Sequence, residues 1–169
     1  YQHIQVKAIN GRIGAVIEGV KLSSSLDATV VQEINQALLK HKVIFFKHQS
    51  HLDDVEQEAF AARLGRPLNH PTVPVKQGSN HILELDSRGA RADSWHTDIT
   101  FLDAYPKAPI LRSIVAPEVG GNTVWANTTT AYNDLPEELK TLAESLRAIH
   151  SNNYDYAAKA SVPAEVLAK

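Results

Sequence analysis

A histidine and an aspartate two positions apart are the most chemically suggestive pair in the sequence, within His96-Thr97-Asp98. If this segment is a strand, the two side chains point to the same face, so an imidazole nitrogen and a carboxylate oxygen lie side by side. Such a pair supplies two ligands of a 2-His-1-carboxylate triad, which leaves positions on Fe(II) open for a bidentate 2-oxoacid and O₂. The tripeptide alone is weak evidence, because a polar pair on a surface strand has the same pattern.

Two longer strings around and after this pair carry a family resemblance. Trp95-His96-Thr97-Asp98-Ile99-Thr100-Phe101 and Gly120-Gly121-Asn122-Thr123-Val124-Trp125-Ala126-Asn127 together resemble the paired signature of taurine dioxygenase-like enzymes. The resemblance extends over nearly the whole chain, through the segments 41–46, 64–67, 69–71 and 131–132. It implies an Fe(II)- and 2-oxoglutarate-dependent dioxygenase, with O₂ as the second cosubstrate.

The resemblance also implies roles for individual residues. It assigns the Fe(II) ligands to His96 and Asp98, the 2-oxoglutarate contact to Thr123, the substrate anion contact to His70, and the apolar substrate wall to Ile99 and Phe101. It implies no catalytic residue beyond the metal ligands. A threonine hydroxyl can donate to a carboxylate, and an imidazole can donate to a sulfate or sulfonate. The alternatives are an ordinary β-forming threonine after a tight turn and a loop histidine packed by Pro71.

Within the family, two segments look most similar to the alkylsulfatase branch, Ile82-Leu83-Glu84-Leu85 and Arg91-Ala92-Asp93-Ser94-Trp95. That branch hydroxylates the carbon next to a sulfate ester, which releases sulfate and an aldehyde, with succinate and CO₂ from 2-oxoglutarate. Alternatives are a taurine or sulfonate dioxygenase, which would release sulfite, and a non-catalytic small-molecule-binding module on the same scaffold. A zinc hydrolase is a further alternative, and it too would require a third protein ligand.

Two residues of the family pattern have no match in this sequence. They are the second iron histidine and the arginine after it that pairs with 2-oxoglutarate. His150 is the only histidine downstream of the motif strings, and it lacks a following arginine, so we do not assign it to iron. We therefore expect residues 1–169 to form a single domain, the N-terminal part of a longer dioxygenase.

The elements that would position these residues follow from local patterns. Asp27 after a serine run predicts a helix that ends near Lys40, and Asp53 predicts a second helix over residues 53–64. Pro136 and the acids after it predict another helix start. The stretch from the second helix to Ser79 is rich in proline, which is typical of a loop, and such a loop could form a pocket wall.

Short β-prone runs are the other predicted elements. The first is Val43–Phe46, which is expected to be buried on both faces. Further runs are Ile82–Leu85, Ser94–Phe101, Ile110–Ala116, Thr123–Asn127 and Leu146–Ser151, and Trp95 and Trp125 within them are expected to be core aromatics. The pattern predicts an α+β fold. The resemblance implies a double-stranded β-helix (jelly-roll, cupin-like) core flanked by helices.

Composition restricts the partners. The 169 residues carry a formal charge of −2, so no basic field favours nucleic acid or an anionic membrane, and a small molecule is the expected partner. No apolar run approaches the ~20 residues that span a bilayer. Cysteine is absent, which excludes disulfides and thiolate metal sites and favours a cytoplasmic location. The sequence leaves a homo-oligomer open.

Overall fold

The computed structural model describes residues 1–86 and 94–152. It divides into two compact units, one of residues 1–64 and 111–147 and the other of the remaining described residues. Every helix and strand in the described ranges belongs to the first unit. Residues 91–93, part of the string typical of the alkylsulfatase branch, lie outside the described residues. Among the helices that can be described, none is long and apolar enough to cross a membrane.

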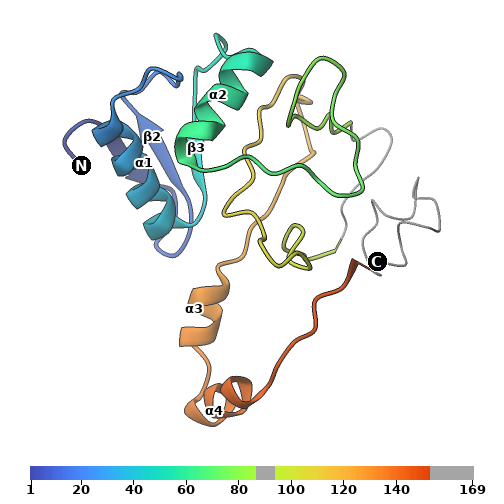
Figure 1. The fold of residues 1–169 in the computed structure, drawn as a ribbon. Coiled ribbons are helices and arrows are strands. Elements are labelled where there is room, and N and C mark those ends of the chain that lie inside the picture. The colour runs from blue at the N-terminus through green and yellow to red at the C-terminus, as the bar shows by residue number, and fades with distance from the viewer. Residues whose placement is uncertain (87–93, 153–169) are drawn as a thin grey trace. The chain divides into compact units, whose positions relative to one another are not determined.

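A three-stranded sheet and a helix form the centre of the first unit (Figure 1). The strands β1 (Gln5–Ala8), β2 (Ala15–Glu18) and β3 (Ile44–Phe46) lie in the order β1-β2-β3. β1 and β2 are antiparallel, whereas β2 and β3 are parallel. A parallel pair requires a crossover connection, and α1 (Ala28–His41) provides it.

The first helix forms as its sequence predicts. Asp27 accepts a hydrogen bond from the Thr29 amide at 2.8 Å and caps the N-terminus of α1. Val31, Ile34 and Ala37 recur at helical spacing and are buried. The helix ends one residue beyond the predicted Lys40.

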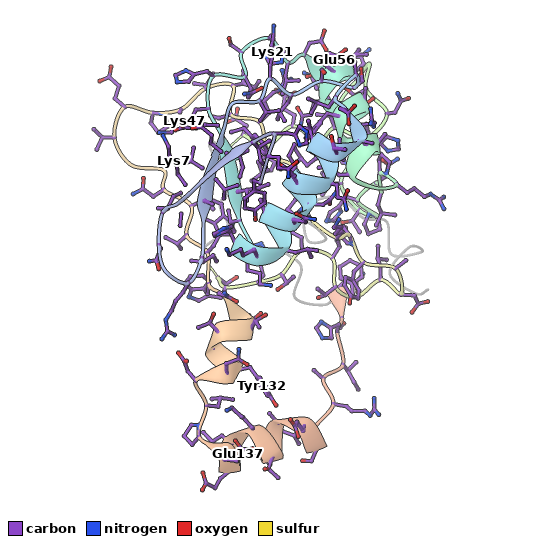
Figure 2. The ribbon with its side chains drawn as sticks, turned by 90° about the vertical axis from the view of Figure 1, so that its left-hand side faces the viewer. Lys7, Lys21, Lys47, Glu56, Tyr132 and Glu137 are labelled. Atoms are coloured by element: carbon purple, nitrogen blue, oxygen red, sulfur yellow. The ribbon has the colours of Figure 1, made fainter. Side chains whose placement is uncertain are left out.

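The second helix, α2 (Asp54–Leu64), confirms the prediction over residues 53–64. The Asp53 carboxylate accepts from the Glu56 amide at 2.8 Å, which satisfies one of the unpaired donors of the first turn. Glu56 lies in the first turn of α2 (Figure 2). Its carboxylate accepts from the Ser24 amide at 3.3 Å, which links α2 to the segment before α1. Arg112 extends this anchoring, because its guanidinium donates to the Leu52 carbonyl and the Asp54 carboxylate.

The apolar core is built within residues 4–60. Its buried members come from the sheet, both helices and the segments between them: Ile4, Ile17, Leu22, Ile34, Ala37, Leu52 and Phe60. Ile34 and Ala37 are fully inaccessible to solvent. β3 is half-buried, not buried on both faces as predicted, because it is the last strand of the sheet.

Two helices follow in the same unit. The helix predicted at Pro136 is confirmed as α4 (Glu137–Ser145), although Leu139 and Leu142 of its apolar face are about half exposed. The short helix α3 (Thr128–Asn133) was not predicted. Its N-cap is Asn127, whose side chain accepts from the Thr130 amide at 3.2 Å.

The later strand predictions are wrong for this structure. The runs Ile82–Leu85, Ser94–Phe101, Ile110–Ala116, Thr123–Asn127 and Leu146–Ser151 are all irregular. A strand exists only when its amides and carbonyls pair with a neighbour, and β propensity depends on that context. These runs have the residue types of strands without a paired neighbour in the described part of the chain. The small sheet with helices agrees with the α+β part of the prediction.

Candidate metal centre

His96 and Asp98 lie side by side in the second unit. His96 Nε2 is 3.2 Å from Asp98 Oδ1, and both side chains are about half exposed. The segment is irregular, so the strand alternation that predicted this pairing is not its cause. The imidazole is held instead by its contact with the Ser94 carbonyl, and the irregular backbone allows both groups to point the same way.

The contact of the other ring nitrogen of His96 determines the tautomer of the imidazole. Nδ1 lies 2.9 Å from the Ser94 carbonyl oxygen, which can only accept, so Nδ1 carries the proton and donates. In metal sites, a histidine whose second nitrogen donates to a carbonyl is held in the tautomer that coordinates through the other nitrogen. In His96 this other nitrogen is Nε2, the one that faces Asp98.

The donor pair has the separation that a shared metal ion requires. Two ligand atoms about 2.1 Å from a first-row divalent metal and at right angles to each other are roughly 3.0 Å apart. The distance of 3.2 Å between Nε2 and Oδ1 is close to that separation. One nitrogen and one carboxylate oxygen also match the ligand types of a non-haem Fe(II) site. A proton shared between the two atoms would suit the same distance, so geometry alone allows an ion pair as well.

A third ligand is not found in the part of the chain that the structure describes. No group of three or more His, Cys, Asp or Glu side chains gathers there in a way that could hold a metal. His150, which the sequence pattern did not assign to iron, has its Nδ1 2.8 Å from the Thr100 hydroxyl. Within residues 1–86 and 94–152 the candidate centre thus has two ligands, His96 and Asp98.

A tight turn follows Asp98. Ile99 has φ of 41°, a left-handed conformation that is uncommon for a β-branched residue, and its carbonyl accepts from the Leu102 amide at 3.3 Å. Strain of this kind often marks functional segments. Ile99 and Phe101 are half-buried. Trp95, by contrast, is 72% exposed, so its assignment to the core is wrong, because the segment packs no strand partner over it.

Thr123 belongs to the first unit and is exposed. It follows Gly120 and Gly121, both with positive φ, and a Cβ on Gly121 would lie 3.2 Å from the Pro117 side chain. The positive φ favours glycine at both positions, and the space beside Gly121 is tight as well. Two residues later, Trp125 packs edge-on against Phe45 of β3, with ring centroids 5.5 Å apart. It is 43% exposed, so it is only partly a core aromatic as expected.

His70 lies half-buried in the proline-rich loop of the second unit, where its Nδ1 faces Thr72 and Val73. The loop itself is confirmed, since residues 65–86 contain no helix or strand. The structure thus brings His96 and Asp98 together, and Thr123 belongs to the other unit.

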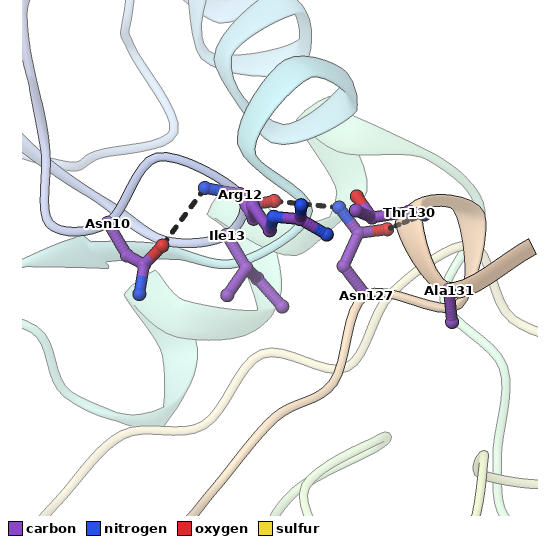
Figure 3. A pocket seen from close by; sticks show the side chains of 6 residues that line it. All are labelled: Asn10, Arg12, Ile13, Asn127, Thr130 and Ala131. Atoms are coloured by element: carbon purple, nitrogen blue, oxygen red, sulfur yellow. Dashed lines mark hydrogen bonds between the residues drawn. The ribbon is translucent and has the colours of Figure 1, made fainter. Parts of the chain in front are cut away.

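One cavity was not indicated by the sequence. It measures about 300 Å³ and lies in the first unit between the turn before β2 and the start of α3, lined by Asn10, Arg12, Ile13, Asn127, Thr130 and Ala131 (Figure 3). The Asn127 amide donates to the Arg12 carbonyl at 2.7 Å, and the Arg12 guanidinium pairs with Asp134. These residues hold α3 in place, and none of the predicted site residues lines the cavity.

Comparison with known proteins places this arrangement in a family. The family model described as "Taurine catabolism dioxygenase TauD, TfdA family" matches residues 5–166. The chain is 60% identical over 156 residues to an alkylsulfatase of Acinetobacter baylyi, which covers 92% of this chain and 49% of the relative. It is 61% identical over 155 residues to an alpha-ketoglutarate-dependent sulfate ester dioxygenase of Pseudomonas putida, which covers 91% of this chain and 52% of the relative.

Solved structures lead to the same family. The chain is similar to a taurine dioxygenase from Burkholderia xenovorans, with a TM-score of 0.73 and 32% identity over 88% of this chain and 53% of the other. The chain spans about half the length of the curated relatives it matches. From the extent of the family match and the identity to these relatives, the chain belongs to the taurine catabolism dioxygenase TauD/TfdA family.

Proposed function

We propose that this chain is the N-terminal part of an Fe(II)- and 2-oxoglutarate-dependent dioxygenase that hydroxylates the carbon next to a sulfate ester. The observation that carries the proposal is the His96–Asp98 pair, at 3.2 Å with the histidine tautomer that metal coordination requires. The substrate class rests on the 60% and 61% identity to an alkylsulfatase and to a sulfate ester dioxygenase. Identity to the taurine dioxygenase structure is lower, at 32%.

Each proposed residue has a defined task. His96 Nε2 and Asp98 Oδ1 would hold Fe(II), and the Ser94 carbonyl keeps the imidazole in its coordinating tautomer. The Thr123 hydroxyl would donate to a carboxylate of 2-oxoglutarate. When bound, Fe(II) with 2-oxoglutarate and O₂ supplies the oxidising power for C–H hydroxylation, with succinate and CO₂ as the other products.

The substrate would be held at both ends. His70 would donate a hydrogen bond to the sulfate, and the half-buried Ile99 and Phe101 would contact the hydrocarbon chain. Hydroxylation of the carbon next to the ester oxygen leaves one carbon with a hydroxyl and a sulfate. Loss of the hydroxyl proton and cleavage of the carbon–oxygen bond to sulfate then give an aldehyde and inorganic sulfate.

The proposal includes a longer protein. A double-stranded β-helix core, the third iron ligand and the arginine for 2-oxoglutarate would be completed by residues that follow position 169. The support is that relatives about twice as long match this chain over half their length. An intact mass of the protein purified from its source tests this, because a mass near 18.6 kDa would contradict a longer chain. A cytoplasmic location remains a prediction.

The test is a substrate panel with the full-length protein, Fe(II), 2-oxoglutarate and O₂. The panel comprises medium-chain alkyl sulfates, alkanesulfonates, taurine and aryloxyacetates, with aldehyde, succinate and sulfate or sulfite measured. Alkyl sulfates should give the highest kcat/KM, because the proposed donor His70 suits an anionic head and the proposed apolar contacts of Ile99 and Phe101 suit a hydrocarbon body. Taurine should be poorer, since its ammonium group would meet those apolar contacts.

The variant His70→Ala should raise KM for alkyl sulfates about tenfold, the usual effect of losing a hydrogen bond to a charged group. His41→Ala, at the end of α1, is the matched control and should behave as wild type. Preference for aryloxyacetates would contradict the sulfate ester assignment while leaving the dioxygenase chemistry in place. Turnover without O₂ or Fe(II) would favour a hydrolase, and 2-oxoglutarate binding without decarboxylation would favour a binding module.

A further inference from the structure

The ring of His70 is held by an arrangement that its proposed role in substrate binding does not require. Three donors converge on Nδ1: the Thr72 amide at 3.2 Å, the Val73 amide at 3.2 Å and the Thr72 hydroxyl at 3.1 Å. All three come from the two residues after Pro71, so the turn 70–73 closes on the imidazole. The ring replaces the carbonyl or carboxylate oxygen that usually accepts in such a turn.

This arrangement determines where the ring proton lies. A backbone N–H can only donate, so Nδ1, which faces two of them, must accept through its lone pair. A neutral imidazole with an accepting Nδ1 carries its proton on Nε2. All three distances lie at the long end of the usual range, as expected when one lone pair is shared among several donors.

We propose that the turn 70–73 selects the Nε2–H tautomer of His70, with Thr72 as the positioning residue that holds the ring. His70 then presents a single donor, and it recognises an acceptor atom such as an oxygen of a sulfate ester. The choice of ligand rests on the proposed function, whereas the tautomer rests on the turn alone. His96 has the opposite tautomer, because its Nδ1 donates to a carbonyl.

The tautomer can be measured directly by ¹⁵N NMR of the histidine side chains. The sample is the full-length protein with diamagnetic Zn(II) in place of iron, at about pH 8, where most histidines are neutral. The His70 signals are identified by their loss in His70→Ala. We expect Nε2 to show the shift of a protonated ring nitrogen and Nδ1 that of an unprotonated one. The reverse pattern would overturn the proposal.

Two amide variants, His70→Asn and His70→Gln, test the two ring nitrogens separately. In His70→Asn, the side-chain oxygen can still accept from the turn amides, but the donor at the Nε2 position is lost. In His70→Gln, the terminal NH₂ lies near the position of Nε2 and can still donate. We expect KM for an alkyl sulfate to rise about tenfold or more in His70→Asn and clearly less in His70→Gln. A better KM in His70→Asn than in His70→Gln would contradict a donor at Nε2.

The role of Thr72 is tested by a conservative pair. Thr72→Val removes the hydroxyl at nearly constant volume, and Thr72→Ser keeps it. We expect Thr72→Val to raise KM for the alkyl sulfate a few-fold, with kcat and KM for 2-oxoglutarate within twofold of wild type, and Thr72→Ser to restore KM. Equal kinetics in Thr72→Val and wild type would remove Thr72 from the proposal.

The proposed tautomer and the proposed function can be disproved independently of each other. If alkyl sulfates are not substrates, the function is wrong, but the NMR result still decides the tautomer. If Nδ1 is found protonated in an active sulfate ester dioxygenase, the function stands and the inference is overturned.

Discussion

Residues 1–64 and the described residues after them differ in how far their apolar side chains are buried. The first region buries its core members to 9% exposure or less, and two of them, Ile34 and Ala37, are fully inaccessible. After Phe60, no residue that the structure describes is buried. Val115 and Val119 are 90% exposed, and Ile149 is 97% exposed. Apolar residues are thus present in both regions, but among the described residues only the first region buries any of them fully.

The difference shows what each region needs from the rest of the chain. In residues 1–64, the caps, the crossover helix and the strands cover one another, so a complete core forms from local partners. In residues 94–127, β-prone runs hold the candidate ligands without a ladder to pair with. Large apolar side chains that are mostly exposed, such as Val115, Val119 and Ile149, are positions that further chain could cover. We infer that this second region is completed by further chain, as the proposed longer enzyme requires.

The largest expected effect is on catalysis. Asp98→Ala removes one of two candidate ligands, so Fe(II)-dependent aldehyde formation by the full-length protein should fall to background. Because Asp98 is about half exposed and lies outside the core, the free energy of unfolding should change by no more than about 0.5 kcal/mol. Asp103→Ala, another exposed aspartate of the same segment, is the control and should retain activity. Activity in Asp98→Ala would remove it from the metal site.

The next effect concerns stability and tests the contrast between the buried apolar residues of 1–64 and the exposed ones after them. Ile34→Ala leaves a cavity in the core and should cost about 2–5 kcal/mol in denaturant unfolding of the 169-residue chain. Ile114→Ala, at a residue that is 72% exposed, should cost within about 0.5 kcal/mol in the same chain.

The same pair in the full-length protein sharpens the comparison. If further chain covers the second region, the cost of Ile114→Ala should rise well above about 0.5 kcal/mol there, whereas that of Ile34→Ala should stay similar. An unchanged cost for Ile114→Ala would show that this position stays exposed in the whole protein and would weaken the inferred completion.

A smaller effect is expected for the cosubstrate. Thr123→Val removes a hydroxyl donor at nearly constant volume and should raise KM for 2-oxoglutarate about tenfold, with a smaller change for the sulfate ester. Thr129→Val, an exposed threonine of α3, is the control. Equal KM values for 2-oxoglutarate in Thr123→Val and wild type would exclude the proposed contact.

The smallest effect belongs to the first region and depends on pH. The Glu33 carboxylate accepts from the backbone amides of Gln2, His3 and Ile4 and contacts the His3 ring. These bonds, that from Gln2 first, lower the pKa of Glu33 from 4.5 to about 2. Because the folded protein binds this proton less readily, the stabilisation is present above about pH 4.5 and is lost as pH falls toward 2.

Glu33→Gln tests this pH dependence. Wild type should be the more stable protein at neutral pH, and the difference should narrow steadily between about pH 4.5 and 2. Urea unfolding at several pH values measures it. A difference that is constant over this range would mean that the Glu33 charge does not stabilise the fold.

Sequence patterns predicted the helices whose capping hydrogen bonds are made within the helix itself. Asp27 and Asp53 cap α1 and α2 as expected, because a cap needs only the amides of its own first turn. The proximity of His96 and Asp98 was also predicted, but for the wrong reason, since the segment is irregular and the Ser94 carbonyl holds the imidazole. Their role as metal ligands stays a prediction.

Other features were not predictable from local signals. β1 and β2 are only four residues each, and β2 pairs with β1 on one side and with the distant β3 on the other. The strands expected around Ile82, Ile110 and Thr123 have suitable residue types, but pairing partners are a tertiary property. The turn that closes on His70 was missed as well, because a histidine that accepts from backbone amides has no sequence pattern of its own.

The confinement of the core to residues 4–60 also affects the order of events during synthesis. Chains are translated from the N-terminus at about 5–20 residues per second, and their domains generally fold as units. A core that needs no later residue can therefore form while the rest of the protein is still being made. We expect this early-folded part to be in place before the β-prone runs leave the ribosome.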